Sequence, residues 1–160
     1  MKVAIERIDE NNKGFLREML YQAIYVPEEE QPLPVSVLDD PLLSKYIEDW
    51  GKEGDFGIIA LIGDLKAGAI WLRYFTSEKK GWGFIAESIP ELSMAMMPEY
   101  RNRGLGTEMM TRFLDLARER GISCISISVD KRNRAVHFYQ RIGFVLVREN
   151  EEDFVMKILL

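Results

Sequence analysis

The chain has 160 residues, of which 47% are hydrophobic and 29% are charged, a balance typical of a globular domain with a buried core. Its net charge of −5 disfavours non-specific binding to DNA or to an anionic membrane, because both favour basic surfaces. With 1 cysteine and 1 histidine, an intrachain disulfide and a zinc site of the usual kind are excluded.

The chain carries no sign of export or membrane insertion. No apolar run approaches the roughly 20 residues of a membrane span. Lys2 and Glu6 place charge too early for a signal peptide. We therefore expect one domain over residues 1–160, located in the cytoplasm, with no metal, no nucleic-acid partner and no membrane partner.

The first half of the chain predicts a strand, two helices and a hairpin. Residues 2–8 alternate in polarity as a strand does. Asn11 or Asn12 is expected to cap a helix that runs through Ile24, and the prolines of residues 26–34 interrupt it. Apolar residues at helical spacing then predict a helix over 40–50. The apolar runs 56–62 and 66–75, joined by Gly63-Asp64-Leu65, predict a hairpin.

The second half predicts alternating strands and helices. It opens with a loop over 76–90 that has room for a short strand at 84–86. The predicted elements that follow are a strand at 92–97, a helix from Gly104 or Gly106 to Arg120, a strand at 122–129, a helix at 134–142, and strands at 144–148 and 154–159. The order β-α-α-β-β-β-α-β-α-β-β is that of an α/β domain with a mixed central sheet.

Gly104 and Gly106 stand where a predicted strand turns into a predicted helix. Two glycines there allow a sharp turn and leave several N–H groups open, with the positive end of the helix dipole behind them. Arg101 and Arg103 add positive charge. The segment therefore predicts a phosphate or pyrophosphate site, with a plain strand-to-helix connection as the alternative. It lacks the lysine of a P-loop, and Met109 stands where a dinucleotide fingerprint needs a third glycine.

Two segments carry a family resemblance. Residues 101–106, Arg-Asn-Arg-Gly-Leu-Gly, resemble the Gln/Arg-x-x-Gly-x-Gly/Ala signature of the GCN5-related N-acetyltransferase (GNAT) superfamily, and Pro98-Glu99-Tyr100 before them is typical of it. Residues 133–144 resemble the second signature, Asn-x-x-Ala-x-x-Phe-Tyr-x-x-x-Gly-Phe, at every defined position. The resemblance is close over about residues 91–147 and looser elsewhere.

The resemblance implies an acetyl-CoA-dependent N-acetyltransferase that moves the acetyl group directly from the thioester to a primary amine. It also implies a GNAT-like α/β fold with a mixed, mostly antiparallel sheet of six or seven strands. In that fold the middle strands splay apart around the acetyl-CoA, and about four helices flank the sheet. The cofactor-binding residues implied are Ala95, Met96, Met97, Arg101, Asn102, Arg103, Gly104, Leu105, Gly106, Thr107, Asn133 and Tyr139.

The resemblance also suggests catalytic residues. An alkyl amine with a pKa near ~10.4 is neutral about once in ~2,500 molecules at pH 7, so a base is needed. Glu91 is the candidate base, with Glu87 in reserve. The alternative is that Glu91 is simply an exposed glutamate after Pro90. Tyr139 is implied as the general acid at the coenzyme sulfur, against a core tyrosine as the alternative. Asn133 is expected to cap the helix that follows it and to contact the coenzyme.

The strand at 122–129 has one face of small residues, namely Cys124, Ser126 and Ser128. A strand covered on both faces is normally apolar throughout. The small face therefore indicates either room for a ligand or a closely packed helix.

The acceptor is less well defined. The acidic and aromatic residues near its expected pocket are Tyr21, Tyr25, Glu28 to Glu30, Asp39, Asp40, Trp71, Tyr74 and Trp82. They favour a cationic amine, although an acidic run beside prolines is also typical of a solvated loop. A small-molecule amine and a protein or peptide amine both remain open. The apolar segment 154–160 allows a homodimer or is a core strand.

Two other functions remain as alternatives. One is a non-catalytic acyl-CoA-binding or sensing module on the same fold. The other is an unrelated phosphate- or nucleotide-binding α/β domain, which gives no reason for the second signature.

Overall fold

The computed structural model describes residues 2–160. The elements are β1 (Val3–Arg7), α1 (Phe15–Ala23), a 3₁₀ helix (Val35–Asp39), α2 (Pro41–Ser44), β2 (Phe56–Ile62), β3 (Leu65–Arg73), β4 (Glu91–Met96), a 3₁₀ helix (Pro98–Tyr100), α3 (Leu105–Glu119), β5 (Cys124–Asp130), α4 (Ala135–Ile142), β6 (Val145–Glu149) and β7 (Asp153–Leu159). The seven strands form one sheet in the order β1-β2-β3-β4-β5-β7-β6. Every neighbouring pair is antiparallel except β4 and β5. The predicted mixed, mostly antiparallel sheet with about four helices is confirmed.

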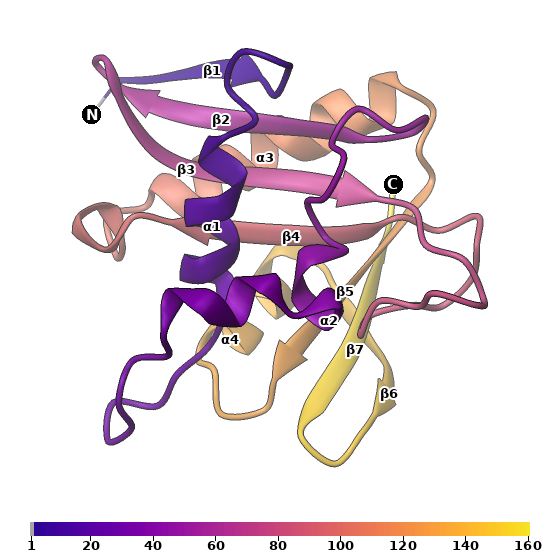
Figure 1. Ribbon diagram of the computed structural model, residues 1–160. Coiled ribbons are helices and arrows are strands. Elements are labelled where there is room, and N and C mark those ends of the chain that lie inside the picture. The colour runs from indigo at the N-terminus through magenta and orange to yellow at the C-terminus, as the bar shows by residue number, and fades with distance from the viewer. Residues whose placement is uncertain (1) are drawn as a thin grey trace.

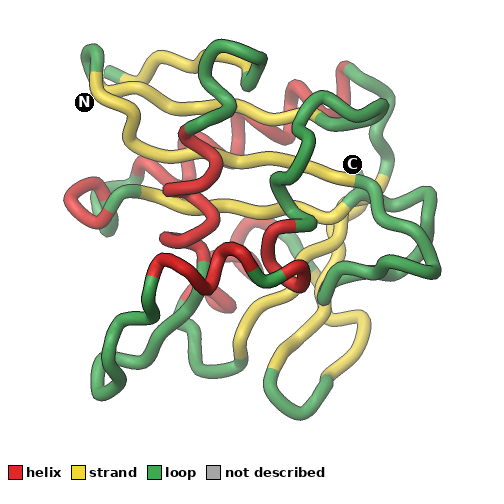
Figure 2. The backbone as a smooth tube through the Cα atoms, in the orientation of Figure 1, coloured by secondary structure: helices red, strands yellow, loops and turns green. Residues whose placement is uncertain are grey.

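The sheet is covered on both faces (Figures 1 and 2). Helices α1 and α2 lie on the near face in Figure 1, where Leu16, Met19 and Trp71 belong to one buried cluster. Helices α3 and α4 lie on the far face, where Phe113 and Tyr139 belong to the other. The apolar stripe of α3, at about four-residue spacing, accounts for this burial.

The strands β4 and β5 diverge in the middle of the sheet. They share a single register pair, Glu91 with Ser126, plus the hydrogen bond from Ser126 N to Pro90 O at 3.0 Å. Beyond this point the edge of β4 has no partner strand, and Figure 1 shows β5 turning away from it. The splayed middle strands expected from the resemblance are therefore present, and they open the sheet between the two core clusters.

The start of α1 differs from the prediction. Neither Asn11 nor Asn12 caps the helix, whose N-cap is Gly14, without a side-chain hydrogen bond. The Asn12 side chain instead accepts from Asp9 N at 2.8 Å and donates to Arg7 O at 2.9 Å. It therefore holds the turn after β1, because that turn has its own unpaired backbone groups to satisfy.

The helix predicted over 40–50 is wrong beyond its first turn. Asp40 caps α2 by accepting from Leu42 N at 2.9 Å, and the regular helix ends at Ser44. The carbonyls of Lys45 and Glu48 accept hydrogen bonds from Arg73 at 3.0 and 2.7 Å. These side-chain bonds replace the backbone bonds of a longer helix, so tertiary contacts overrode the helical spacing.

The loop before β4 differs from one expectation, since residues 84–86 form no strand. The small face of β5 is open in part, because Ser128 lines a cavity. The loop also packs against β5, because a Cβ at Gly83 would lie 2.9 Å from the backbone of Ile127 and Ser128. A glycine is needed at position 83 for this approach.

Candidate active site

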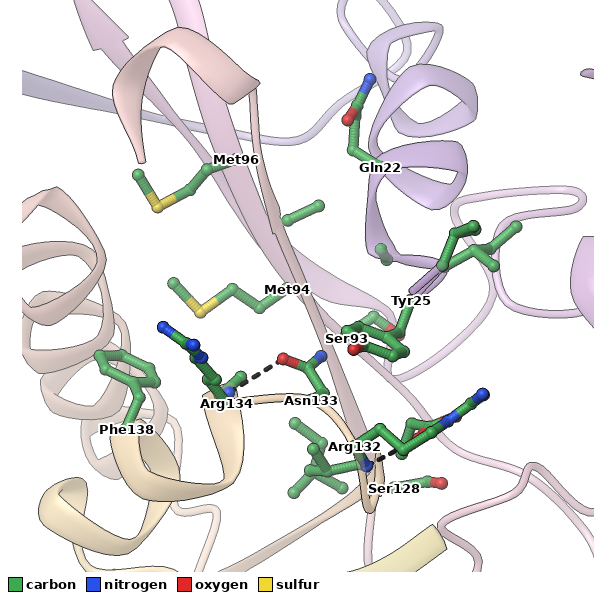
Figure 3. Close-up of a pocket in the computed structure, with 18 of the residues that line it drawn as sticks. Gln22, Tyr25, Ser93, Met94, Met96, Ser128, Arg132, Asn133, Arg134 and Phe138 are labelled. Atoms are coloured by element: carbon green, nitrogen blue, oxygen red, sulfur yellow. Dashed lines mark hydrogen bonds and ion pairs between the residues drawn. The ribbon is translucent and has the colours of Figure 1, made fainter. Parts of the chain in front are cut away.

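A cavity of about 1600 Å³ opens where β4 and β5 diverge. Its walls come from the end of α1 and the loop after it, from β4, from the loop before α3, from β5 and from α4. Figure 3 shows Met94, Met96 and Phe138 along one side, with Tyr25, Arg132 and Ser128 on the other. Segments that are far apart in the sequence therefore face one shared space.

One wall carries a row of free backbone donors. Among the described residues, the N–H groups from Asn102 to Thr107 have no hydrogen-bond acceptor, and the first bonded N–H is that of Glu108, which donates to Gly104 O. Asn102 and Gly104 have φ values of 62° and 80°, a left-handed conformation that turns the chain sharply before α3. Such a row at a helix N-terminus suits an anion.

The two arginines of this loop take different positions. Arg101 lines the cavity, and it donates to Met96 O at 3.2 Å and to Gln22 Oε1 at 2.9 Å. It thereby ties the loop to α1. Arg103 is exposed and is not among the residues that line the cavity.

The other residues expected to bind the coenzyme divide into two groups. Ala95, Met96, Asn102, Gly104, Gly106 and Thr107 line the cavity. Met97 and Leu105 instead pack into the two core clusters. A Cβ at Gly106 would lie 3.4 Å from Met94 Cε and 3.8 Å from Phe138, which are ordinary contact distances, so the start of α3 packs beside these two side chains.

Glu91 begins β4 at the point where β4 and β5 still pair. Its side chain lines the cavity and is only 4% exposed. Oε2 accepts a 2.6 Å hydrogen bond from the hydroxyl of Tyr46, whereas Oε1 is buried without a hydrogen-bond partner among the described residues. The alternative of an exposed glutamate is therefore wrong.

Burial raises the pKa of Glu91 from 4.5 to about 7, because a carboxylate loses its hydration there. The hydrogen bond from Tyr46 opposes this rise, as do the nearby Gly83 N–H and the charge of Lys45. The Gly83 N–H lies near the carboxyl without meeting the geometry of a hydrogen bond to Oε1. The result is a carboxyl that is partly ionised near neutral pH.

The residue that hydrogen-bonds to Glu91 lies in the segment after α2, which does not continue as a regular helix. The hydroxyl of Tyr46 donates to Glu91 and accepts from Trp82 N at 2.8 Å. The Tyr46 carbonyl accepts from Trp71 Nε1 at 3.1 Å. Arg73, which forms a buried ion pair with Asp55 at 2.7 Å, fixes the neighbouring carbonyls. Strand β3 thus positions the tyrosine that orients the carboxyl.

Tyr139 lies on α4, lines the cavity and is 7% exposed. Its ring contacts Phe138 and Phe144 edge to face, so its body is part of the core. Its hydroxyl forms no hydrogen bond with the described residues, and burial raises its pKa. The phenol is therefore neutral at pH 7.

Asn133 caps α4, since its Oδ1 accepts from Ala135 N at 2.9 Å (dashed in Figure 3). The residue also lines the cavity, which leaves its amide nitrogen available to a ligand.

Glu87, the reserve base, is exposed and lies outside the cavity. It accepts from Ser77 N at 2.9 Å and from Ser77 Oγ at 3.0 Å, and these bonds lower its pKa. A carboxyl held in this way is a weak base.

The comparisons with known proteins agree with this geometry. The model of the acetyltransferase (GNAT) family matches residues 18–144. The chain belongs to this family.

Streptothricin acetyltransferase from Streptomyces lavendulae is 29% identical to this GNAT chain over 119 residues. The match covers 66% of this chain and 58% of that relative's own length.

Two solved structures share the GNAT fold. The PaiA N-acetyltransferase from Thermoplasma acidophilum, solved with coenzyme A, has a TM-score of 0.70 at 18% identity and covers 100% of both chains. YncA from Salmonella typhimurium, solved with acetyl-CoA, has a TM-score of 0.70 at 16% identity, over 100% of this chain and 95% of the other.

Of the residues considered for the acceptor pocket, some line the cavity of this GNAT chain and others do not. Tyr21, Tyr25, Glu28, Glu29, Glu30 and Trp82 line the cavity. Trp71 is buried in the core, Asp39 pairs with Arg17, Asp40 caps α2, and Tyr74 packs near Gly54, so these four are not part of the lining.

Two residues of the GNAT site were not predicted. Tyr46 was among the apolar positions of the helix predicted over 40–50, and Asp153 stands just before the strand predicted at 154–159. In the sequence, the two glycines on either side of Trp82, Gly81 and Gly83, were the only indication of a close backbone contact in this region. A Cβ at Gly81 would overlap Glu91 Oε1, so the loop at Gly81 packs directly against that carboxyl.

Among residues 2–160, no helix is both long and apolar enough to cross a bilayer. Over the same residues, no three His, Cys, Asp or Glu side chains converge in a way that would hold a metal ion.

Proposed function

We propose that this chain is an acetyl-CoA-dependent N-acetyltransferase that moves the acetyl group directly to a primary amine. One observation carries the proposal: free backbone N–H groups and a buried carboxyl with a pKa near 7 face the same cavity. The first can hold the anion of a coenzyme, and the second can take a proton from an amine. A loop with only a structural role would not explain why free N–H groups and a buried carboxyl face the same cavity.

The N–H groups from Asn102 to Thr107 are proposed to hold the pyrophosphate of the coenzyme. Their donors are unsatisfied and the dipole of α3 lies behind them, so an anion stabilises this end of the helix. The unpaired edge of β4 near Met94 and Met96 leads from this loop toward Glu91, which suits the extended pantetheine arm.

Glu91 is proposed as the general base. An alkyl ammonium with a pKa near ~10.4 must lose a proton before it can attack a thioester. A carboxyl of pKa about 7 accepts that proton more readily than an ordinary one of pKa 4.5, by about 3 kcal/mol. The carboxyl is still ionised in about half of the molecules at pH 7, which is close to the optimum for a base.

Tyr139 is proposed to stabilise the departing sulfur. Its hydroxyl is free of protein partners and is neutral at pH 7, so it can donate to a developing thiolate. The order of events is then proton transfer from the ammonium group to Glu91, attack of the neutral amine nitrogen on the thioester carbon, and cleavage of the C–S bond while the Tyr139 hydroxyl hydrogen-bonds to the departing sulfur. As this bond breaks, the nitrogen loses its second proton to form the amide, and the thiolate takes up that proton to form the thiol.

The test compares ligands by thermal unfolding, with acetyl-CoA, coenzyme A, ATP and NAD at equal excess. A ligand at about 100 times its dissociation constant stabilises by roughly 2.7 kcal/mol, which raises the melting temperature by several degrees. We expect a shift with the two coenzyme A forms only. An equal shift with ATP or NAD would overturn the proposed preference of this site for coenzyme A.

A second step separates an enzyme from a coenzyme-binding module. Thiol release is followed with acetyl-CoA and a panel of amines, beside the variant Glu91→Gln. Release that depends on both the amine and Glu91 supports the enzyme. Binding of acetyl-CoA without release, over the whole panel, would overturn the proposed reaction and favour the non-catalytic module.

A further inference from the structure

Asp153, the first residue of β7, is an oriented carboxylate without a basic partner. Its Oδ2 accepts from Ser128 Oγ and its Oδ1 accepts from Asn150 Nδ2, so two hydrogen bonds fix its direction. Lys131 and Arg132, which follow the register partner of Asp153 on β5, are engaged elsewhere, since Lys131 pairs with Glu149 and Arg132 with Asp130. Asp153 is half-buried and lines the cavity, so its charge faces a ligand rather than bulk water.

The cavity is lined by both acidic and basic residues. Its acidic residues are Glu28, Glu29, Glu30, Glu91, Asp130, Glu152 and Asp153, and its basic residues are Arg101, Arg132, Arg134 and Arg141. Arg132 is bound to Asp130, and Arg101 to Gln22. The two remaining arginines belong to the α4 side, beside the free N–H groups where an anionic coenzyme is proposed to bind. At the end of the cavity with Glu91 and Asp153, the lining residues are acidic, and the nearest positive charge that acts on Glu91 is that of Lys45, outside the lining.

Glu91 and Asp153 are close enough to be bridged by one small molecule. Glu91 pairs in register with Ser126, and Ser128 lies two residues further on the same face of β5 and binds Asp153. Two residues along a strand span roughly 7 Å. The Oε1 of Glu91 is buried against Gly81 without a hydrogen-bond partner among the described residues, so the protein leaves part of the acceptor capacity of this carboxyl unused.

An aromatic ring completes this end of the cavity. Trp82 lines it and is 47% exposed, while its ring stacks on Tyr46 at 5.9 Å. An indole beside carboxylates favours an ammonium group. Lys45 already contacts this indole, since its Nζ lies 5.5 Å from the centroid of the Trp82 ring and donates to Lys80 O at 2.6 Å, but Lys45 is not among the residues that line the cavity.

We propose that the acceptor is a short aliphatic amine with a second cationic group, as in a diamine, and that Asp153 binds this second group while the reacting amine lies at Glu91. This inference rests on the proposed function, because it names the substrate class of the same site. Asp153 is thus a specificity-determining residue, since it selects the acceptor.

The test compares 1,4-diaminobutane with butylamine, which has the same carbon chain and one charge fewer. Thiol release gives kcat/KM for each amine with acetyl-CoA, and calorimetry gives the affinity of each amine for the coenzyme A-bound protein. We expect the protein to prefer the diamine by tenfold or more. Asp153→Asn should remove this preference by lowering kcat/KM for the diamine about tenfold or more, with a much smaller change for butylamine, because only the diamine loses a charge-assisted hydrogen bond.

The control is Glu151→Gln, an exposed acidic neighbour that does not line the cavity and should keep the preference. An unchanged thermal shift with coenzyme A shows that Asp153→Asn remains folded. Equal kcat/KM values for the two amines in the unmodified protein would overturn this inference and leave the proposed reaction intact. Diamine binding that depends on Asp153 but gives no thiol release would support the inference and overturn the proposed reaction. No binding and no turnover of the diamine, in protein that binds coenzyme A, would overturn the inference.

Discussion

The hydroxyl of Tyr46 donates a 2.6 Å hydrogen bond to Oε2 of Glu91, across 45 positions of sequence. The same hydroxyl accepts from the N–H of Trp82, so one tyrosine joins the segment after α2, the loop before β4 and β4 itself. It stabilises the charged form of a carboxyl that burial would otherwise keep protonated. The balance of these two effects sets the pH range in which Glu91 can act as a base.

Replacing Tyr46 by Phe should move the pH dependence of the reaction. The hydrogen bond from Tyr46 lowers the pKa of Glu91, so its loss raises that pKa further above 7. We expect the acid limb of kcat/KM to move to higher pH by about one unit, with activity largely recovered near pH 9. The pH profile is measured beside Tyr74→Phe, a tyrosine outside the cavity that should leave it unchanged. An unmoved acid limb in Tyr46→Phe would contradict the role of this bond.

Replacing Glu91 by Gln should remove the base without removing the acceptor for Tyr46. We expect kcat/KM at pH 8 to fall by about 10²–10⁴ and the acid limb near pH 7 to disappear. The affinity for coenzyme A should stay the same, because the free N–H groups are untouched. Glu87→Gln, at an exposed glutamate outside the cavity, serves as the control. A rate within a few-fold of the unmodified protein would exclude Glu91 as the base.

The same substitution should change how stability depends on pH. Folding raises the pKa of Glu91, so the folded chain binds this proton more tightly than the unfolded chain. The contribution of Glu91 to the free energy of unfolding therefore falls, by about 3 kcal/mol, as the pH rises from about 4.5 to about 7. Glu91→Gln should lack this fall and be at least as stable at pH 8, as judged by denaturant unfolding at several pH values. Marked destabilisation at pH 8 would contradict the raised pKa.

Replacing Tyr139 by Phe should separate binding from turnover. The hydroxyl has no protein partner among residues 2–160, and the ring keeps its contacts with Phe138 and Phe144. We expect an unchanged thermal shift with coenzyme A and a kcat lower by about 10²-fold or more, the usual effect of losing one acid catalyst. Calorimetry and thiol release measure the two effects, with Tyr74→Phe again as the matched tyrosine. Loss of coenzyme binding in step with kcat would assign Tyr139 a structural role instead.

Gly81 should not tolerate a side chain. A Cβ there would overlap Glu91 Oε1 and would lie 2.7 Å from the hydroxyl of Tyr46. Gly81→Ala should therefore push the loop of Trp82 away and admit water to Glu91, which lowers its pKa toward the ordinary range. We expect an acid limb at lower pH and a kcat/KM reduced several-fold. Gly14→Ala is the control, because a Cβ at Gly14 would meet no atom within 4 Å. If Gly81→Ala keeps the pH profile, the loop does not control the burial of Glu91.

The sequence was most informative where structure depends on near neighbours. Gly104 and Gly106, the periodic apolar residues of α3 and the cap at Asn133 act over a few positions, so each predicted its local structure correctly. Such short-range patterns correctly predicted the order of strands and helices and the row of free N–H groups before α3. They also placed Glu91 at the start of the strand that leads to that row.

The tertiary structure decided what these elements face. The helical spacing of residues 40–50 failed because Arg73 and Trp71, on a later strand, take the carbonyls that a longer helix would use. Glu91 became a buried carboxyl of raised pKa because the loop of Gly81 and Gly83 lies over it, and the hydrogen bond from Tyr46 limits that rise. Asp153 reaches the same cavity through the pairing of β5 with β7. Burial and charge depend on partners brought together by the register of the sheet, so no local pattern in the sequence could reveal them.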